Sequence, residues 1–360
     1  MSGAGAPFLL LGDGEERPFD AALLERELRS MWKGSREGTA FYRAALANII
    51  VPLAPNSESL PEVIAEVCRR HPARLFRIQP RSAKSREPQL SARASALCYM
   101  RSGGTGFVCS EQIIIEWSAE TASLVPSAIG ALLIGDLPVV LLSLQAAPGA
   151  SWSTLHDRAD LIIADSCAEE EPALLPSIWE RTGRRGAPMR DLAWARIAPW
   201  RALIAELFDS PEGDSTLAAL RDVTLTHGGA APPSTAWLLA GWIASRLGWR
   251  VLSRDGHRWR LQGPNAHIDV TLTRDESVSS PVIGTVQLRA AGAHPLDVRL
   301  AHRHGDPTVR VEWLAPRASS SESPFVFRDL AAAIVGEMQR LESNPAFRDA
   351  AHFASIMIRS

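Results

Sequence analysis

Apolar positions in the first half of the chain predict short buried strands that alternate with helices. The expected strands are residues 45–53, 74–78, 96–100, 107–117, 138–144 and 159–164. Helices are expected at residues 61–70 and 118–134, where apolar residues recur at helical spacing. The strands at 96–100 and 107–117 flank a glycine-rich turn, which predicts a hairpin. This pattern favours an α/β fold with a mixed, largely parallel sheet that has helices on both faces.

The second half of the chain has a different pattern, with helices first and period-two strands afterwards. Helices are expected at residues 174–181, 191–208, 235–247 and 325–341. Strands are expected at residues 258–261, 267–273, 282–289, 297–301 and 309–314. These strands predict an antiparallel meander with packed helices, and the helix at 325–341 is expected to end the regular structure. We therefore expect two domains, an N-terminal α/β domain at 1–166 and a C-terminal α+β domain at 167–360.

Composition and charge limit the kinds of partner that the protein is expected to bind and the compartment in which it is expected to work. The 360 residues carry 38 basic and 40 acidic side chains, with no long block of one sign, which argues against nucleic acid and membrane surfaces as partners. The apolar stretch at 124–144 contains two prolines and a Gly-Asp pair, so it is expected not to span a bilayer. The N-terminus lacks the basic region of a signal peptide, and four cysteines are too few for a disulfide scaffold. We expect a cytoplasmic protein.

Cys98 and Cys109 are equally distant from the centre of the predicted hairpin turn. A symmetric hairpin places them opposite each other on two strands, at a distance that permits a redox-active disulfide. In a reducing compartment we expect instead two small buried thiols packed side by side, with the disulfide as the alternative.

Other polar residues are candidates for ligand binding. The loop at 101–106 (RSGGTG) could bind phosphate through its backbone N–H groups, although a hairpin turn needs the same glycines. Asp136 and Asp165 follow predicted strands, where α/β enzymes place functional groups, and turns and caps also use aspartate. A nucleotide- or sugar-phosphate-binding enzyme of the transferase type is therefore an alternative function. His302, His304 and Asp306 are a weaker candidate metal site, and no catalytic motif or cofactor site is found.

Eleven tryptophans against two tyrosines are an unusual aromatic balance. Trp200, Trp237 and Trp242 fall at core positions of predicted helices, whereas Trp194 and Trp249 are expected at the surface, where they could anchor a partner.

Five short segments occur together in a characteristic order. They are NIIV at 48–51, HPAR at 71–74, EQI at 111–113 with GDLPV at 135–139, ADLIIADS at 159–166, and DLAWARIAPWR at 191–201. Together they resemble the glucose-6-phosphate dehydrogenase assembly protein family, OpcA, over roughly residues 45–250. The resemblance implies a non-catalytic activator that binds glucose-6-phosphate dehydrogenase, favours its active oligomer and so supports the oxidative pentose phosphate pathway and NADPH supply. Within the last segment, the candidate contacts to the dehydrogenase are Trp194, Arg196, Trp200 and Arg201.

Overall fold

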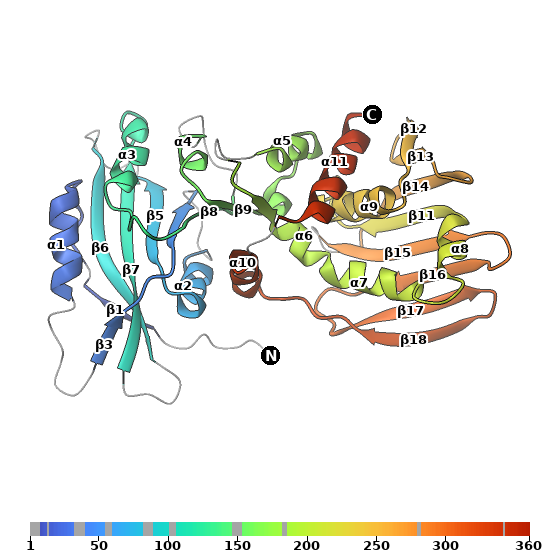
Figure 1. Ribbon diagram of the computed structural model, residues 1–360, viewed down its shortest axis with the longest axis horizontal. Coiled ribbons are helices and arrows are strands. Elements are labelled where there is room, and N and C mark those ends of the chain that lie inside the picture. Colours follow the sequence, from blue (N-terminus) through green and yellow to red (C-terminus); the bar gives the residue numbers. More distant parts are fainter. Residues whose placement is uncertain are drawn as a thin grey trace. The chain divides into compact units, whose positions relative to one another are not determined.

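The computed structural model describes residues 8–12, 14–31, 40–54, 60–81, 89–100, 106–145, 153–181, 186–278, 282–340 and 343–360. The chain divides into two compact units, and most of their elements are labelled in Figure 1. Unit 1 comprises residues 1–164, 182–190 and 329–341, and unit 2 comprises residues 165–181, 191–328 and 342–360. The chain passes between the two units several times along its sequence.

Unit 1 is built on a mixed sheet with the order β1-β6-β7-β5-β4-β8-β9-β10, in which β2 also pairs with β6 and β3 with β7. Its strands are β1 (Phe8–Leu11), β2 (Arg17–Pro18), β3 (Ala40–Arg43), β4 (Asn48–Pro52), β5 (Arg74–Pro80), β6 (Ser91–Met100), β7 (Gly106–Trp117), β8 (Val139–Ser143), β9 (Leu161–Ala164) and β10 (Met189–Asp191). The neighbours β7, β5, β4, β8 and β9 are parallel, and β6 with β7 forms the antiparallel hairpin. The predicted largely parallel sheet and its hairpin are confirmed.

Helices pack on both faces of this sheet. The helices are α1 (Ala21–Met31), α2 (Leu60–Arg70), α3 (Val125–Gly130), α4 (Ser153–His156) and α10 (Leu330–Met338). Successive residues of a strand point to opposite faces, and neighbouring residues of β6 meet different helices. Cys98 lies in an apolar cluster that contains Met31 of α1, while the hydroxyl of Tyr99 donates to the Ala65 carbonyl of α2. Helices α1 and α2 therefore cover opposite faces, and the expectation of helices on both faces is confirmed. The helix expected at 118–134 is shorter, and α1 and the strands before residue 45 were not predicted.

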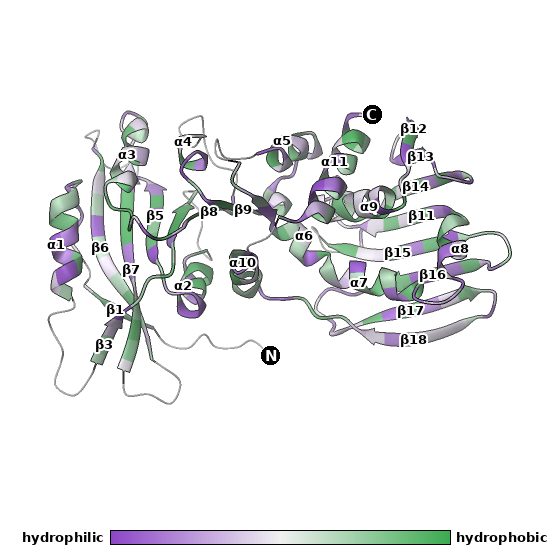
Figure 2. Cartoon of the chain, viewed as in Figure 1, coloured by the Kyte–Doolittle hydropathy of each residue, from purple (hydrophilic) through white to green (hydrophobic). Residues whose placement is uncertain are grey.

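Unit 2 contains a second sheet with the order β12-β13-β14-β11-β15-β16-β17-β18. Its strands are β11 (Leu220–His227), β12 (Arg250–Asp255), β13 (Arg258–Gln262), β14 (His267–Arg274), β15 (Ile283–Ala290), β16 (Leu296–Ala301), β17 (Thr308–Ala315) and β18 (Ser319–Pro324). The predicted meander is interrupted, because β11 inserts between β14 and β15 and pairs in parallel with β14. Apolar side chains of this sheet are buried on one face, and polar residues such as Thr224, Thr271 and Gln287 occupy the other, which gives the alternation in Figure 2.

The helices of unit 2 are α5 (Leu175–Trp179), α6 (Leu192–Arg196), α7 (Ala198–Leu207), α8 (Gly213–Ala218), α9 (Ser234–Arg246) and α11 (Pro345–Arg359). The helix expected at 191–208 is thus two helices that meet at Ile197. Regular structure does not end at residue 341 as expected, since α11 follows and packs on α9. Gly241 permits this packing, because a Cβ there would lie 2.3 Å from the Ala350 carbonyl oxygen. No helix in the described part of the chain has the length and apolar character needed to cross a membrane.

Candidate functional site

The motif residues of unit 1 hold its parallel strands in place. Asn48 is fully buried on β4, and its side-chain amide donates to the carbonyls of Ile134 (3.0 Å) and Leu137 (3.2 Å). Its side-chain oxygen accepts from the Ile134 N–H at 2.9 Å. This one side chain therefore ties the NIIV strand to the GDLPV turn, and its role is structural.

Arg74 and Glu111 link the HPAR and EQI segments in the same unit. Both side chains are buried, and the Arg74 Nε lies 2.7 Å from Glu111 Oε2. Arg74 also contacts Glu25 of α1 and donates to the Leu132 carbonyl, while Glu111 has a second partner in Arg43. A buried ion pair with additional hydrogen bonds satisfies the charges that burial removes from water.

Asp191 is the centre of a buried polar network in unit 2. It caps the N-terminus of α6 and accepts from the backbone N–H groups of Ala193 (2.9 Å) and Ser166 (3.2 Å). Its other oxygen accepts from the Trp179 indole at 2.7 Å. Burial raises the pKa of Asp191, and the hydrogen bonds from Ser166 and Ala193 oppose that rise. The carboxylate therefore joins the start of α6 to the 3₁₀ turn at Ser166 and to the last residue of α5, Trp179.

Asp165 and Arg196 form the outer part of this network. Two guanidinium nitrogens of Arg196 approach the two carboxylate oxygens of Asp165 at 2.5 and 2.7 Å, a bidentate pair. Burial would lower the pKa of Arg196, but the hydrogen bonds and charge of Asp165 raise it above its usual value. Asp165 also caps the short 3₁₀ turn that carries Cys167. The carboxylate of Asp165 is thus engaged in structure, which leaves it unsuited to act as a free catalytic acid.

The predicted contact residues of the DLAWARIAPWR segment are integrated into unit 2. Trp194 is 2% exposed and packs against Phe347, and Trp200 is 1% exposed. The guanidinium of Arg201 lies over the Trp194 ring, 3.5 Å from its centroid. The prediction that Trp194 lies at the surface is therefore wrong, because its ring fills the space between helices.

Two further tryptophan predictions also fail. Trp249 is 4% exposed, although a surface position was expected. Trp242, which was expected in the core, is only half-buried. Helix α9 is apolar all round, so its sequence does not indicate which face stays uncovered.

Cys98 and Cys109 lie directly opposite each other on β6 and β7, as the symmetric hairpin predicts. The structure joins them in a disulfide with Cα atoms 4.0 Å apart, so the expected pair of free thiols is not the state observed. Burial raises the pKa of each described free thiol, Cys68 and Cys167, to about 12. Both are therefore protonated at neutral pH and poor nucleophiles.

The remaining candidate ligand groups lie in different units or partly outside the described residues. Most of the loop at 101–106 lies outside the described residues, which begin again at Gly106. Asp136 is exposed in a turn of unit 1. His302 and His304 follow β16 instead of lying on it, and His302 is buried against Phe325 while His304 is exposed. No group of three metal-binding side chains is present among the described residues.

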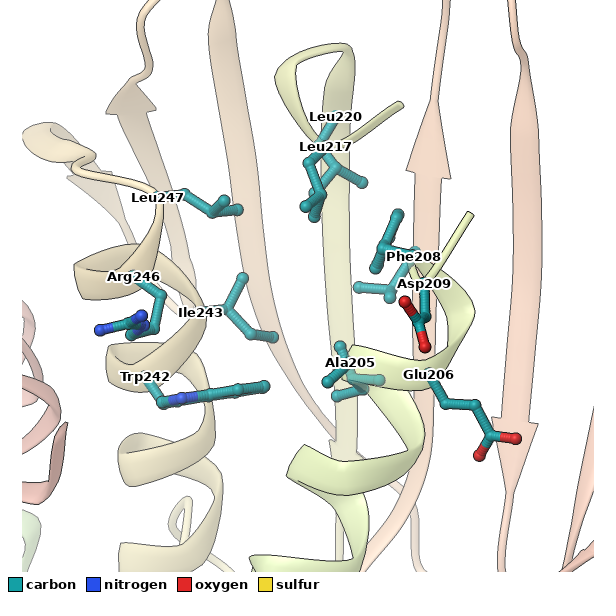
Figure 3. Close-up of a pocket in the computed structure, with 12 residues that line it drawn as sticks. Ala205, Glu206, Phe208, Asp209, Leu217, Leu220, Trp242, Ile243, Arg246 and Leu247 are labelled. Atoms are coloured by element: carbon teal, nitrogen blue, oxygen red, sulfur yellow. The ribbon is translucent and has the colours of Figure 1, made fainter. Parts of the chain in front are cut away.

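A pocket of about 580 Å³ opens in unit 2 between α7, α8 and α9 (Figure 3). Its buried floor is formed by Ile204, Phe208, Leu220, Ile243 and Leu288. Its half-buried walls are Leu217, Trp242 and Leu247, with Ala205 exposed beside them. Glu206, Asp209 and Arg246 are exposed at the rim. The sequence did not identify this pocket, although Trp242 on α9 and Phe208 at the C-terminal cap of α7 are its strongest signal.

A second pocket in unit 2, of about 470 Å³, lies beside the aromatic side chains of Trp200, Phe325 and Phe327. Arg196 lines it, but the pairing of this arginine with Asp165 neutralises its charge.

Dehydrogenases and reductases are among the solved structures that align weakly with the chain, with TM-scores below 0.5. A variant of the 3-ketoreductase KijD10 from Actinomadura kijaniata has a TM-score of 0.48 at 10% identity, covering 87% of this chain and 96% of that one. The WlbA dehydrogenase from Thermus thermophilus has a TM-score of 0.42 at 11% identity, with 87% and 94% covered. Similarity this low does not bear on the chemistry of the chain.

Sequence relatives are more specific. Proteins named OxPP cycle protein OpcA are similar to the chain, at 30% identity over 225 residues in Nostoc punctiforme and 26% over 222 residues in Synechocystis sp.. Each match covers 61% of this chain but only 46% and 45% of the relative, so less than half of each relative's length is matched. Residues 65–176 match the glucose-6-phosphate dehydrogenase subunit N-terminal domain, and residues 187–351 match the C-terminal domain. The chain belongs to the glucose-6-phosphate dehydrogenase subunit family, OpcA.

Proposed function

We propose that the chain is a non-catalytic, cytoplasmic assembly factor that binds glucose-6-phosphate dehydrogenase and favours its active oligomer. The observation that carries this proposal is the match of both parts of the chain to the two domains of one dehydrogenase subunit family. The role supports the oxidative pentose phosphate pathway and NADPH supply, and it requires no nucleic acid or membrane partner.

The physical basis of such activation is linkage between binding and assembly. A protein that binds the active oligomer more tightly than the dissociated enzyme shifts the population toward the oligomer, by no more than its differential affinity. This mechanism requires no reacting group on the activator. In the described part of the chain, the polar side chains of Asn48, Asp165 and Asp191 are engaged in hydrogen bonds that hold the fold.

The experiment is a titration of the purified chain into glucose-6-phosphate dehydrogenase from the same organism, with sedimentation and NADPH production followed together. We expect a faster-sedimenting complex whose activity exceeds that of the enzyme alone. An unrelated NADP-dependent dehydrogenase serves as the specificity control. A complex without a kinetic change would indicate a scaffold, and no complex with a verified active enzyme would refute the proposal.

The alternative of a ligand-binding enzyme has its own test, which needs no dehydrogenase. Thermal unfolding of the chain alone is measured with NADP, glucose 6-phosphate and sugar nucleotides, because a ligand that binds the folded chain raises its midpoint. The proposal predicts no shift with any of them, whereas a concentration-dependent shift would favour the enzyme.

A further inference from the structure

The pocket between α7, α8 and α9 is large enough for several apolar side chains at once. Its volume of about 580 Å³ exceeds the space that one anchoring side chain fills. Nine of its twelve lining residues are apolar, and the half-buried Trp242 projects from α9 into it (Figure 3). Tryptophan in an open apolar hollow is typical of sites that bind a partner through a few large side chains.

The backbone around the pocket indicates the kind of segment that fits. Its walls are helices, and its two strand residues, Leu220 and Leu288, come from β11 and β15 in the interior of the sheet. An extended segment would need a free sheet edge to bond its backbone, and no such edge lines the pocket. A helix satisfies its backbone internally and presents apolar side chains three and four residues apart on one face.

The charged residues at the rim indicate which charges a bound segment would carry on each side of the pocket. Glu206 and Asp209 lie at the α7 side of the pocket and Arg246 at the α9 side (Figure 3). All three are exposed, and none forms an ion pair within the part of the chain that the structure describes. A segment with a basic residue beside α7 and an acidic residue beside α9 would complement them.

We propose that this pocket is a groove that binds an amphipathic helix of the partner protein. Two or three apolar side chains of that helix enter the groove, a lysine or arginine lies next to Glu206 and Asp209, and an aspartate or glutamate lies next to Arg246. The inference rests on the proposed function, so the helix belongs to the dehydrogenase.

The first test blocks the groove sterically. Ala205 is exposed on its wall, so Ala205→Trp fills the groove without replacing a core residue. The matched control is Ala202→Trp, also exposed on α7 but not lining the pocket. In the titration with glucose-6-phosphate dehydrogenase, we expect the Kd to rise at least tenfold for Ala205→Trp and to stay within twofold of wild type for Ala202→Trp. Unchanged thermal midpoints establish that both variants are folded.

The second test reverses the acidic rim. Glu206→Arg with Asp209→Arg should raise the Kd at least tenfold at low ionic strength, and the difference should shrink as salt screens the charges. The control, Glu170→Arg with Glu171→Arg, changes the net charge equally at two exposed positions away from the groove and should stay within twofold.

The two failures can be told apart. If wild type binds and both groove variants bind equally well, the groove assignment is wrong and the proposed function stands. If wild type itself fails to bind a verified active dehydrogenase, the proposed function fails and the groove assignment fails with it.

Discussion

The buried pair of Arg74 and Glu111 offers the sharpest test of what the family motifs do. Its side chains are 3% and 1% exposed, and the charged atoms are 2.7 Å apart. Removing one partner of such a pair leaves a buried charge and costs about 3–5 kcal/mol. For Arg74→Met we expect about 3 kcal/mol, because Glu111 keeps its second partner, Arg43. For Glu111→Met we also expect about 3 kcal/mol, because Arg74 keeps Glu25.

The double variant Arg74→Met with Glu111→Met should cost much less than the sum of about 6 kcal/mol. Neither buried charge remains. Arg43 and Glu25 also lose a partner, but both reach solvent, so the main cost is the Leu132 carbonyl, which loses a donor at about 1–3 kcal/mol. We therefore expect a total of about 2 kcal/mol for the double variant. The control is the more exposed pair Glu66 and Arg69 on α2, where the same substitutions should cost less than about 1 kcal/mol.

The assay combines urea unfolding with hydrogen exchange of peptides from β5 and β7. Two probes are needed because a chain with two compact units need not unfold in one step, and exchange reports on unit 1 alone. A double variant as costly as the two single variants together would refute the reasoning, because the pair would then make no coupled contribution. Single variants within about 1 kcal/mol of wild type would do the same.

Three further outcomes are expected. Trp194→Ala should lower the unfolding free energy by about 3–5 kcal/mol in urea titrations, because it empties a buried site; wild-type stability would place this ring at the surface. Thiol titration of the denatured chain should detect two thiols without reductant and four with it, and four in both cases would contradict the Cys98–Cys109 bridge. Because burial raises the pKa of Cys68 from 9.0 to about 12, the stability of wild type relative to Cys68→Ala should hold below pH 9 and decline between pH 9 and 12 in equilibrium unfolding; a pH-independent difference would show that Cys68 does not titrate differently on folding.

The candidate site shows where reasoning from pattern alone fails. Trp194 and Trp249 were assigned to the surface and are buried, while Trp242 was assigned to the core and lines the groove. Trp194 and Trp242 sit in helices with apolar neighbours on several sides, so periodicity does not distinguish a covered face from an open one, and Trp249 lies in the connection between α9 and β12, which has no period. The cysteine pair was located correctly, because strand register depends only on the symmetry of the hairpin.

The sequence by itself determined the family and many of the local elements, but not α1, α11 or the division of residues 191–208 into α6 and α7. Apolar runs and turn residues specify strands such as β4, β5 and β8, since burial on both faces of a parallel sheet requires continuous apolar segments. The tertiary structure decided what depends on distant partners: the insertion of β11 beside β14, the packing of α11 on α9, and the opening between α7 and α9. These features depend on which surfaces of distant segments cover one another. The hydrophobic period of a single segment carries no information about its distant partners.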